Sequence, residues 1–315
     1  MTRGRRRRRP FPHATTRAFF RERRSAPGYT LLDFLHGYVY GRWPYAYIGT
    51  AIGERRIPAL LQPLVRLGAR LTRRKARDAA PGRNAFADRY HGKVVPPDLA
   101  ERLVTLDHDI ELRGIEHVVP YPVARDLVLK APDHIVALEC PCRSEHENPC
   151  LPLDVCLVIG EPFAGFIAEQ HPGRSRWITQ AEAVEILRAE HERGHVHHAF
   201  FKDAMLGRFY AICNCCTCCC GAMQAFAHGI PMLASSGYVA SVEPTRCVGC
   251  GTCVDACPFG ALACDGRSLV VDVERCMGCG VCVSKCPQAA LALVRDPERP
   301  LPLDLDALLA SPRCG

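Results

Sequence analysis

The sequence predicts an α+β protein with a mainly helical N-terminal part, a cysteine-rich α/β middle domain and a C-terminal module built on a repeated cysteine motif. Leucines at helical spacing in residues 57–77 indicate an amphipathic helix. A β-like run at 134–138 and a capped helix after Thr179 accompany two dense cysteine groups in the middle of the chain. One cysteine pattern then occurs twice between Cys247 and Pro287.

Twenty cysteines are the most informative feature of the composition. With 315 residues and 48% hydrophobic content, the chain can form two or three domains with real cores. We see no secretory signal, and disulfide frameworks are expected in short secreted chains, so the cysteines indicate metal ligands in a reducing compartment. We therefore expect a soluble, cytoplasmic protein.

Residues 1–27 are predicted to form a basic, disordered arm. Residues 1–24 contain ten Arg and one Glu, a local charge of +9, which leaves −2 of the net +7 for the rest of the chain. The arginines from Arg5 to Arg9 are not followed by the apolar stretch that an export signal requires. We favour a solvated arm and do not expect nucleic-acid binding, while peripheral contact with an anionic membrane is left open.

Residues 28–131 are predicted to combine an aromatic segment with a helical region. Seven aromatic residues lie within residues 28–53, but polar and charged residues interrupt this run too often for a membrane span. Such side chains suit a half-buried surface, so we expect the segment to pack on the body of the protein rather than on a partner or a membrane. Beyond the 57–77 helix, prolines in the first turn predict short helices over 97–106 and 122–130.

Residues 132–236 are predicted to form a cysteine-rich iron–sulfur domain. A capping box of Thr179 and Glu182 begins its helix, and Gly194 ends it. Four cysteines lie within 140–156 and six more within 213–220. The six cannot all face one metal, so we expect some of them to join the first four in one [4Fe-4S] cluster, or in two clusters with two thiols left over. These clusters would be additional to those of the C-terminal module. The candidate ligands are Cys140, Cys142, Cys150, Cys156, Cys213, Cys215, Cys216, Cys218, Cys219 and Cys220.

Three histidines, His195, His197 and His198, follow the capped helix. We interpret them as residues favoured electrostatically beyond a helix C-terminus. Metal ligation and proton donation to a reduced substrate are the alternatives. The isolated Cys264 and Cys314 are expected to bind no metal.

The repeated motif is Cys-x2-Cys-x2-Cys-x3-Cys-Pro, a spacing that lets three thiolates converge on one [4Fe-4S] cluster and carries the fourth cysteine to the other cluster. Four-thiolate zinc sites more often use two separated cysteine pairs, which argues against zinc here. The motif therefore predicts one cluster on Cys247, Cys250, Cys253 and Cys286 and a second on Cys276, Cys279, Cys282 and Cys257.

Residues 237–296, with every ligand position filled, resemble the bacterial-type dicluster ferredoxins. The resemblance implies a small pseudo-twofold α+β unit that passes single electrons, followed here by a C-terminal tail over 297–315. From about Tyr29 to Asp296 the chain also resembles a group of bacterial iron–sulfur proteins in which CPCR and CNCC-x-CCC stretches precede a dicluster ferredoxin module. That second resemblance supports the order of the domains and implies no reaction.

These features predict an iron–sulfur electron-transfer protein that relays single electrons between two [4Fe-4S] clusters, one or two further clusters and a partner redox protein. No phosphate-binding loop or dinucleotide fingerprint is seen, so a nucleotide cofactor site has no support. We expect a carrier or redox subunit rather than a catalyst. The alternatives are a reductase with a substrate-binding central cluster, and a cluster-stabilised scaffold that contacts nucleic acid or a membrane.

Overall fold

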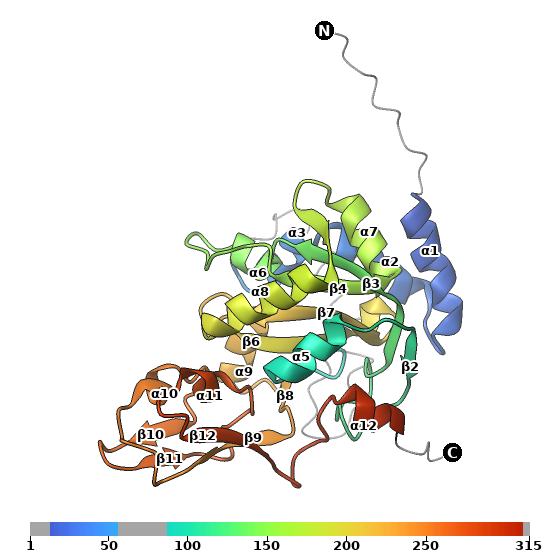
Figure 1. Cartoon of the computed structure of the whole chain (residues 1–315). Helices are drawn as coiled ribbons and strands as arrows, with labels where there is room; N and C mark the ends of the chain where they lie inside the picture. Colours follow the sequence, from blue (N-terminus) through green and yellow to red (C-terminus); the bar gives the residue numbers. More distant parts are fainter. Residues whose placement is uncertain (1–12, 56–86, 311–315) are drawn as a thin grey trace.

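The computed structural model of the chain describes residues 13–55 and 87–310. Within these residues, one large mixed sheet forms the body, and a smaller module with two short sheets lies beside it (Figure 1). The strand order of the large sheet is β2-β3-β4-β7-β6-β1-β8, and β5 pairs with β3. Its strands are β1 (Tyr90–Val94), β2 (Ile110–Leu112), β3 (Leu127–Leu138), β4 (Cys156–Glu161), β5 (Ser175–Ile178), β6 (Val196–Lys202), β7 (Arg208–Cys215) and β8 (Leu233–Ala234).

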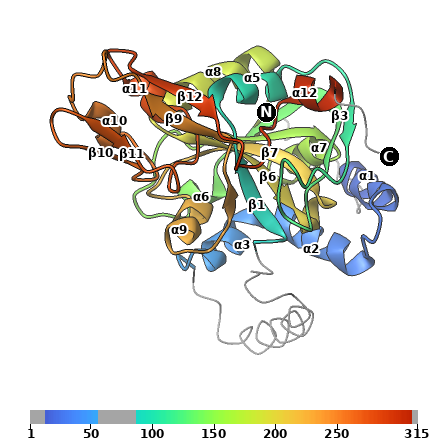
Figure 2. The same ribbon diagram turned by 90° about the horizontal axis from the view of Figure 1, so that it is seen from below.

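Helices cover both faces of the large sheet (Figure 2). One face carries α5 (Pro97–Val104) and α8 (Gln180–Glu192), which pack on each other and on the sheet. The opposite face carries α1 (Ala14–Glu22), α2 (Leu31–Arg42), α3 (Pro44–Ala51), α6 (Pro141–Ser144), α7 (Phe163–Gln170) and α9 (Gly221–Ala227). Among the described residues, no helix has both the length and the apolar character needed to cross a membrane.

The prediction of a disordered arm over residues 1–27 is wrong for residues 13–27, which form α1 and a short 3₁₀ turn. Phe19 of α1 is fully buried, and its ring meets Phe34, Phe163 and Phe166 edge-on. The buried Phe19 ring thus anchors α1 on the core, although most of the side chains around it are polar or charged. Residues 1–12, which carry most of the arginines, lie outside the described part of the chain.

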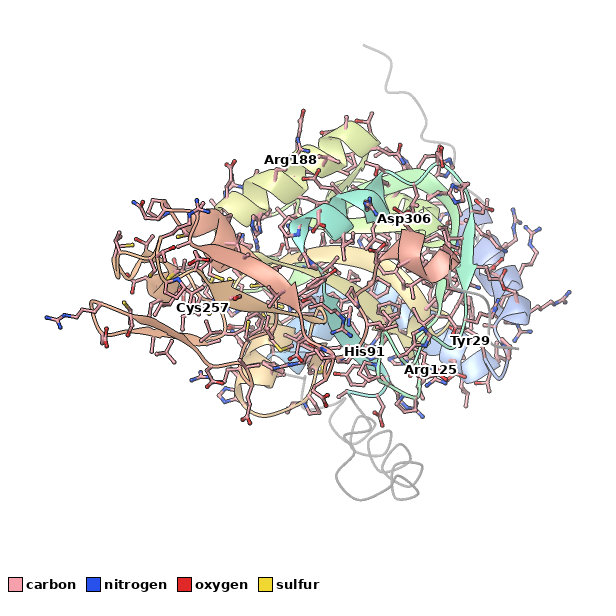
Figure 3. The ribbon with its side chains drawn as sticks, turned by 60° about the horizontal axis from the view of Figure 1, so that its bottom comes forward. Tyr29, His91, Arg125, Arg188, Cys257 and Asp306 are labelled. Atoms are coloured by element: carbon pink, nitrogen blue, oxygen red, sulfur yellow. The ribbon has the colours of Figure 1, made fainter. Side chains whose placement is uncertain are left out.

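The aromatic segment packs on the body, as predicted, through α2 and α3. The hydroxyl of Tyr40 lies 2.7 Å from that of Tyr210 on β7, and the hydroxyl of Tyr29, at the α1–α2 corner in Figure 3, donates to the carbonyl of Ala204. The predicted 97–106 helix is confirmed as α5, whereas the 57–77 helix lies outside the described residues.

The predicted helix over 122–130 is wrong, because most of these residues lead into or belong to β3. Leu127, Val128 and Leu129 are buried and pair with β2, and Lys130 pairs with β4. This tertiary pairing overrides the helix-start signal of Pro122. The boundary proposed between residues 131 and 132 therefore falls inside one strand. Strands from both predicted segments, 28–131 and 132–236, share one sheet.

The predicted strand at 134–138 and the capped helix are confirmed. The side chain of Thr179 accepts a hydrogen bond from the backbone N–H of Glu182, which begins α8. Gly194 follows the helix with a φ of 85°, a backbone conformation that favours glycine.

The C-terminal module repeats one small unit twice. It contains β9 (Tyr238–Val242), α10 (Thr252–Asp255), β10 (Leu262–Cys264), β11 (Leu269–Val271), α11 (Val281–Lys285) and β12 (Leu291–Arg295). Strand β9 pairs with β12, and β10 pairs with β11. Gly251 and Gly280 occupy equivalent positions, each with a left-handed φ just before a short helix. Beyond the module, α12 (Leu305–Ala310) of the predicted tail returns to the body, where Asp306 pairs with Arg102.

Candidate metal centres

The eight cysteines of the module form two groups with exchanged fourth members. The first module group, which lines one small pocket, is Cys247, Cys250, Cys253 and Cys286. The second module group, which lines another, is Cys257, Cys276, Cys279 and Cys282. Cys257 and Cys286 thus lie with the other repeat's cysteines, which is the arrangement that the motif predicts for two cluster sites.

The two module groups differ in their exposure. Cys250 is exposed and Val248 beside it is 63% exposed, so the first group lies at the surface. Cys279 is buried and belongs, with its neighbours Met277 and Val281, to the hydrophobic core of the body. The second group therefore faces the body, and the first group faces solvent.

Three kinds of contact hold the module against the body. The backbone N–H of Ser236 donates to the carbonyl of Met277 at 3.0 Å, and the Lys285 ammonium donates to the carbonyl of Glu192 at the end of α8. The rings of Phe226 on α9 and Phe259, two residues beyond Cys257, meet edge-on with centroids 6.0 Å apart. Cys257 is labelled in Figure 3, within the module.

The burial of the second module group fits a bound cationic cluster. Burial raises the pKa of the Cys279 thiol, and it raises that of Cys282 to about 12. Thiolates would be unfavourable there without a positive partner, whereas bound iron supplies that charge and displaces the protons. The residues present therefore suit the iron–sulfur clusters that the motif implies.

A second concentration of thiols surrounds a cavity of about 230 Å³ in the body. The cavity lies between the sheet and helices α2, α3 and α9, and its wall is mostly apolar. Seven of the ten predicted central ligands line it. Six of these are here called the cavity thiols: Cys140, Cys142, Cys156, Cys213, Cys215 and Cys220.

Strand register and helix ends position the cavity thiols. Cys213 and Cys215 are two residues apart on β7 and so project to one face, and Cys156 pairs with Cys213 across β4 and β7, with 3.4 Å between their Sγ atoms. Cys140 and Cys220 precede the first residues of α6 and α9. The fold thus brings together cysteines that are 80 residues apart in the sequence.

The cavity thiols interact with one another in a chain. Cys140 contacts Cys142 and Cys156, and Cys220 contacts Cys142 and Cys215. The hydrogen bond with Cys142, together with burial, raises the pKa of Cys140 to about 12. The hydrogen bond with Cys220 lowers the pKa of Cys215, but burial and the charges of Cys213, Cys140 and Cys142 together outweigh it and raise the value to about 12. As in the module, free thiolates at this site would be unfavourable without a positive partner.

Tyrosines form another part of the cavity wall. The lining tyrosines are Tyr40, Tyr47, Tyr90 and Tyr210. Tyr210 lies at a break in the register of β6 and β7, because Phe200 pairs with Ala211 and Phe201 pairs with Phe209. The ammonium of Lys202 lies 4.6 Å, 5.4 Å and 4.4 Å from the ring centroids of Tyr40, Tyr47 and Tyr90. The sequence analysis did not identify Lys202. The only feature that could have indicated a buried cation is the density of tyrosines in residues 28–53.

The other four predicted ligands, here called the outer quartet, are Cys150, Cys216, Cys218 and Cys219. The Sγ atoms of Cys150, Cys216 and Cys218 all lie within 4.8 Å of one another, and that of Cys219 is 3.6 Å from Cys218. Cys218 is exposed, and Cys216 also borders the cavity. The ten central cysteines thus divide into six and four.

The three predicted histidines occupy different surroundings. His195 lies beside the outer quartet, with its Nε2 3.6 Å from the Sγ of Cys150. His197 hydrogen-bonds to Asn214, and burial lowers its pKa to about 4. His198 pairs with Cys213 across β6 and β7, and burial lowers its pKa to about 3. Only His195 contacts a thiol of the outer quartet among the hydrogen bonds of the described residues.

A buried ion pair that sequence reasoning did not identify supports His195. The Arg143 guanidinium donates to the Glu190 carboxylate at 2.7 Å, and both side chains are almost fully buried. The Nδ1 of His195 lies 2.7 Å from the same carboxylate. The CPCR stretch placed Arg143 beside two cysteines, but its partner Glu190 lies on α8 and could not be inferred from spacing.

Comparison with known proteins identifies one segment. A family model described as a 4Fe-4S dicluster domain matches residues 240–287, which contain both module groups. No curated protein and no solved structure matches the chain significantly. The ferredoxin-like nature of the module, and its binding of 4Fe-4S clusters, are thereby supported.

Proposed function

We propose that this chain is an iron–sulfur electron-transfer protein that relays single electrons between a partner redox protein and a centre at the cavity thiols. Bound [4Fe-4S] clusters exchange single electrons at potentials set by burial, hydrogen bonding and solvent access. The exposed first module group exchanges electrons with the partner protein, and the second group passes them between the first group and the body. The need of so many thiols for a reducing environment favours a cytoplasmic location.

The observation that carries this proposal is the path between the second module group and the cavity. Phe259 lies two residues beyond Cys257 and meets Phe226, which lies on α9. Cys220, at the start of the same helix, is one of the cavity thiols. An aromatic contact therefore links the matched dicluster domain with the helix that begins at a cavity thiol.

The cavity thiols suit a further iron–sulfur centre. The six cavity thiols line one cavity, and burial disfavours free thiolates there. Cys140, Cys142, Cys215 and Cys220 are four thiols linked in a row and supply the ligand number of one cubane. Cys156 and Cys213 would then be the two spare thiols.

Iron and sulfide analysis of anaerobically purified full-length protein tests the proposal. We expect about twelve irons and a similar amount of sulfide per chain, since two module clusters account for about eight. Replacing Cys140, Cys142 and Cys220 together by Ser should lower iron to about eight, while Cys264→Ser should leave it unchanged. A wild-type content of eight irons or fewer would contradict the further centre.

A second candidate function is reduction of a small substrate in the cavity, and the tyrosine wall favours it. The Tyr40 and Tyr210 hydroxyls lie 2.7 Å apart, and burial raises the pKa of both, so they remain protonated and can donate hydrogen bonds to a substrate beside the thiols. Reduced wild-type protein should then show a change in one cluster's electron paramagnetic resonance signal with a productive substrate. Tyr210→Phe should keep the resting spectrum but lose that response, and indifference to a broad panel of small oxidants would count against catalysis.

A further inference from the structure

We propose that the outer quartet, Cys150, Cys216, Cys218 and Cys219, binds a single zinc ion that is separate from the iron–sulfur centres. This site is independent of the proposed electron-transfer function. It follows from the distances between four sulfur atoms and from the buried network that supports them.

Three sulfur atoms of the outer quartet, those of Cys150, Cys216 and Cys218, lie closer together than any three of the cluster motifs. Three of the four are mutually within 4.8 Å, and no other trio of Cys, His, Asp or Glu ligand atoms in the described residues meets this limit. The two module groups, which belong to the matched 4Fe-4S domain, are therefore more widely spaced in the same structure. Three members of the outer quartet are thus spaced more tightly than a cubane site requires, and the Cys219 sulfur adjoins them through Cys218.

A tetrahedral mononuclear ion needs that tighter geometry. With zinc–sulfur distances of about 2.3 Å, the sulfur atoms of a four-thiolate site lie about 3.8 Å apart. Cys218 and Cys219 are 3.6 Å apart, and Cys216 also interacts with the Cys219 side chain. Four cysteine thiolates are the preferred ligand set of zinc, with the close trio supplying three and Cys219, next to Cys218, supplying the fourth.

The backbone holds the quartet together from two segments. Cys216, Cys218 and Cys219 lie in the turn between β7 and α9, where the N–H of Cys220 donates to the carbonyl of Cys216 at 3.2 Å. The backbone N–H of Cys150 donates to the Cys219 sulfur, which joins the loop after α6 to this turn. An ion at this point would clamp two segments that are 66 residues apart in the sequence.

A buried polar network supports the site, as is usual around protein-bound zinc. The His195 ring lies between the Cys150 sulfur, at 3.6 Å from Nε2, and the Glu190 carboxylate, at 2.7 Å from Nδ1. Arg143 donates to Glu190 and to the carbonyl of Asn214, the residue before Cys215. Four thiolates and one zinc ion carry a net charge of −2, which the Arg143 guanidinium partly offsets.

Metal analysis of the anaerobically purified full-length chain tests the assignment. We expect about one zinc per chain alongside the iron, and zinc absorption-edge spectroscopy should show sulfur ligands at about 2.3 Å. The double variant Cys150→Ser/Cys218→Ser should lose the zinc and keep the wild-type iron and sulfide content. Cys264→Ser, a cysteine outside both central groups, should keep both metals.

The possible results separate this site from the iron–sulfur proposal. Absence of zinc from the wild-type protein, or zinc bound through nitrogen and oxygen, would overturn the inference. Loss of about four irons rather than zinc in the double variant would show that the quartet holds a cubane instead. If the double variant does not fold, the absorption-edge spectrum of the wild type still decides between sulfur and other ligands.

Discussion

Lys202 lies almost fully buried at the end of β6, among the rings of Tyr40, Tyr47 and Tyr90. The faces of these rings attract the ammonium, which holds the tyrosines that line the cavity. Burial nevertheless disfavours the charged form, and it lowers the pKa of Lys202 from 10.5 to about 8. The Lys202 ammonium therefore loses solvation by water but gains contacts with the three rings beside the cavity.

This lowered pKa predicts a specific pH dependence of stability. Between pH 8 and pH 10.5 the unfolded chain binds a proton at Lys202 that the folded protein has released. The free energy of unfolding should therefore rise with pH in this window, by up to about 1.4 kcal/mol per pH unit from this group. Below pH 8 both states are protonated, and this contribution no longer changes.

Denaturant unfolding under anaerobic conditions at several pH values checks this prediction. The Lys202→Met variant should lack the lysine-dependent rise, whereas Lys130→Met, at a side chain that is 45% exposed, should retain it. Parallel pH profiles for wild type and Lys202→Met would show that Lys202 titrates normally.

Residues whose partners are close in sequence could be predicted, and residues whose partners are distant could not. The spacing of Cys247 to Cys286 predicted two groups with exchanged members, and the structure brings those cysteines together in that way. The division of the ten central cysteines depends on β4 lying beside β7, which no local spacing encodes. For the same reason Glu190 and Lys202 were not recognised.

At the scale of elements, the fit of α2 against the body depends on a glycine. A Cβ on Gly37 would lie 2.1 Å from the backbone carbonyl oxygen of Ala204 and 3.0 Å from the ring of Phe19. A backbone atom cannot move aside as a flexible side chain can, so α2 would have to shift. Because α2 carries Tyr40, this shift would also alter the wall of the cavity.

We therefore predict that Gly37→Ala destabilises the protein by about 1–3 kcal/mol, although alanine favours helix formation by about 1 kcal/mol in an exposed helix. Anaerobic denaturant unfolding measures the change. Gly173→Ala is the control, since a Cβ there meets nothing within 4 Å. A Gly37→Ala variant as stable as the wild type would mean that α2 packs less closely than the structure shows.

The elements that could be predicted have strong local signals. The capping residue Thr179 and the proline at the start of α5 each predicted a helix that is present. The same proline argument failed at Pro122, where pairing with two strands determines the conformation. Helix α1 was missed because one buried ring, Phe19, outweighs the many charged residues around it.

At the scale of the whole molecule, the module is joined to the body as part of its core rather than by a linker. Met277, Cys279 and Val281 belong to the body's hydrophobic core, and α12 beyond the module packs near α5, where Asp306 pairs with Arg102. This attachment fixes the second module group towards the body. The order of the domains was visible in the sequence, but this orientation was not, because it depends on contacts that only the folded chain creates.

The fixed orientation predicts that the contact between Phe226 and Phe259 controls electron transfer into the body. Phe226→Ala should leave the metal content unchanged, because Phe226 is distant in sequence from every module cysteine and its removal takes away no thiol. It should slow reduction of the cavity centre several-fold, because a void replaces the ring that packs against Phe259. Stopped-flow reduction, with the cluster absorbance and signals followed in time, measures the two phases.

The matched controls isolate the role of the aromatic contact. Phe226→Leu preserves most of the packing and should give an intermediate rate, while Trp177→Ala removes an exposed aromatic ring on β5 and should have no effect. A slow phase confined to the cavity centre, with normal reduction of the exposed first module group, would place the defect between module and body. Unchanged rates in Phe226→Ala, with full metal content, would mean that electrons reach the body by another route or stay within the module.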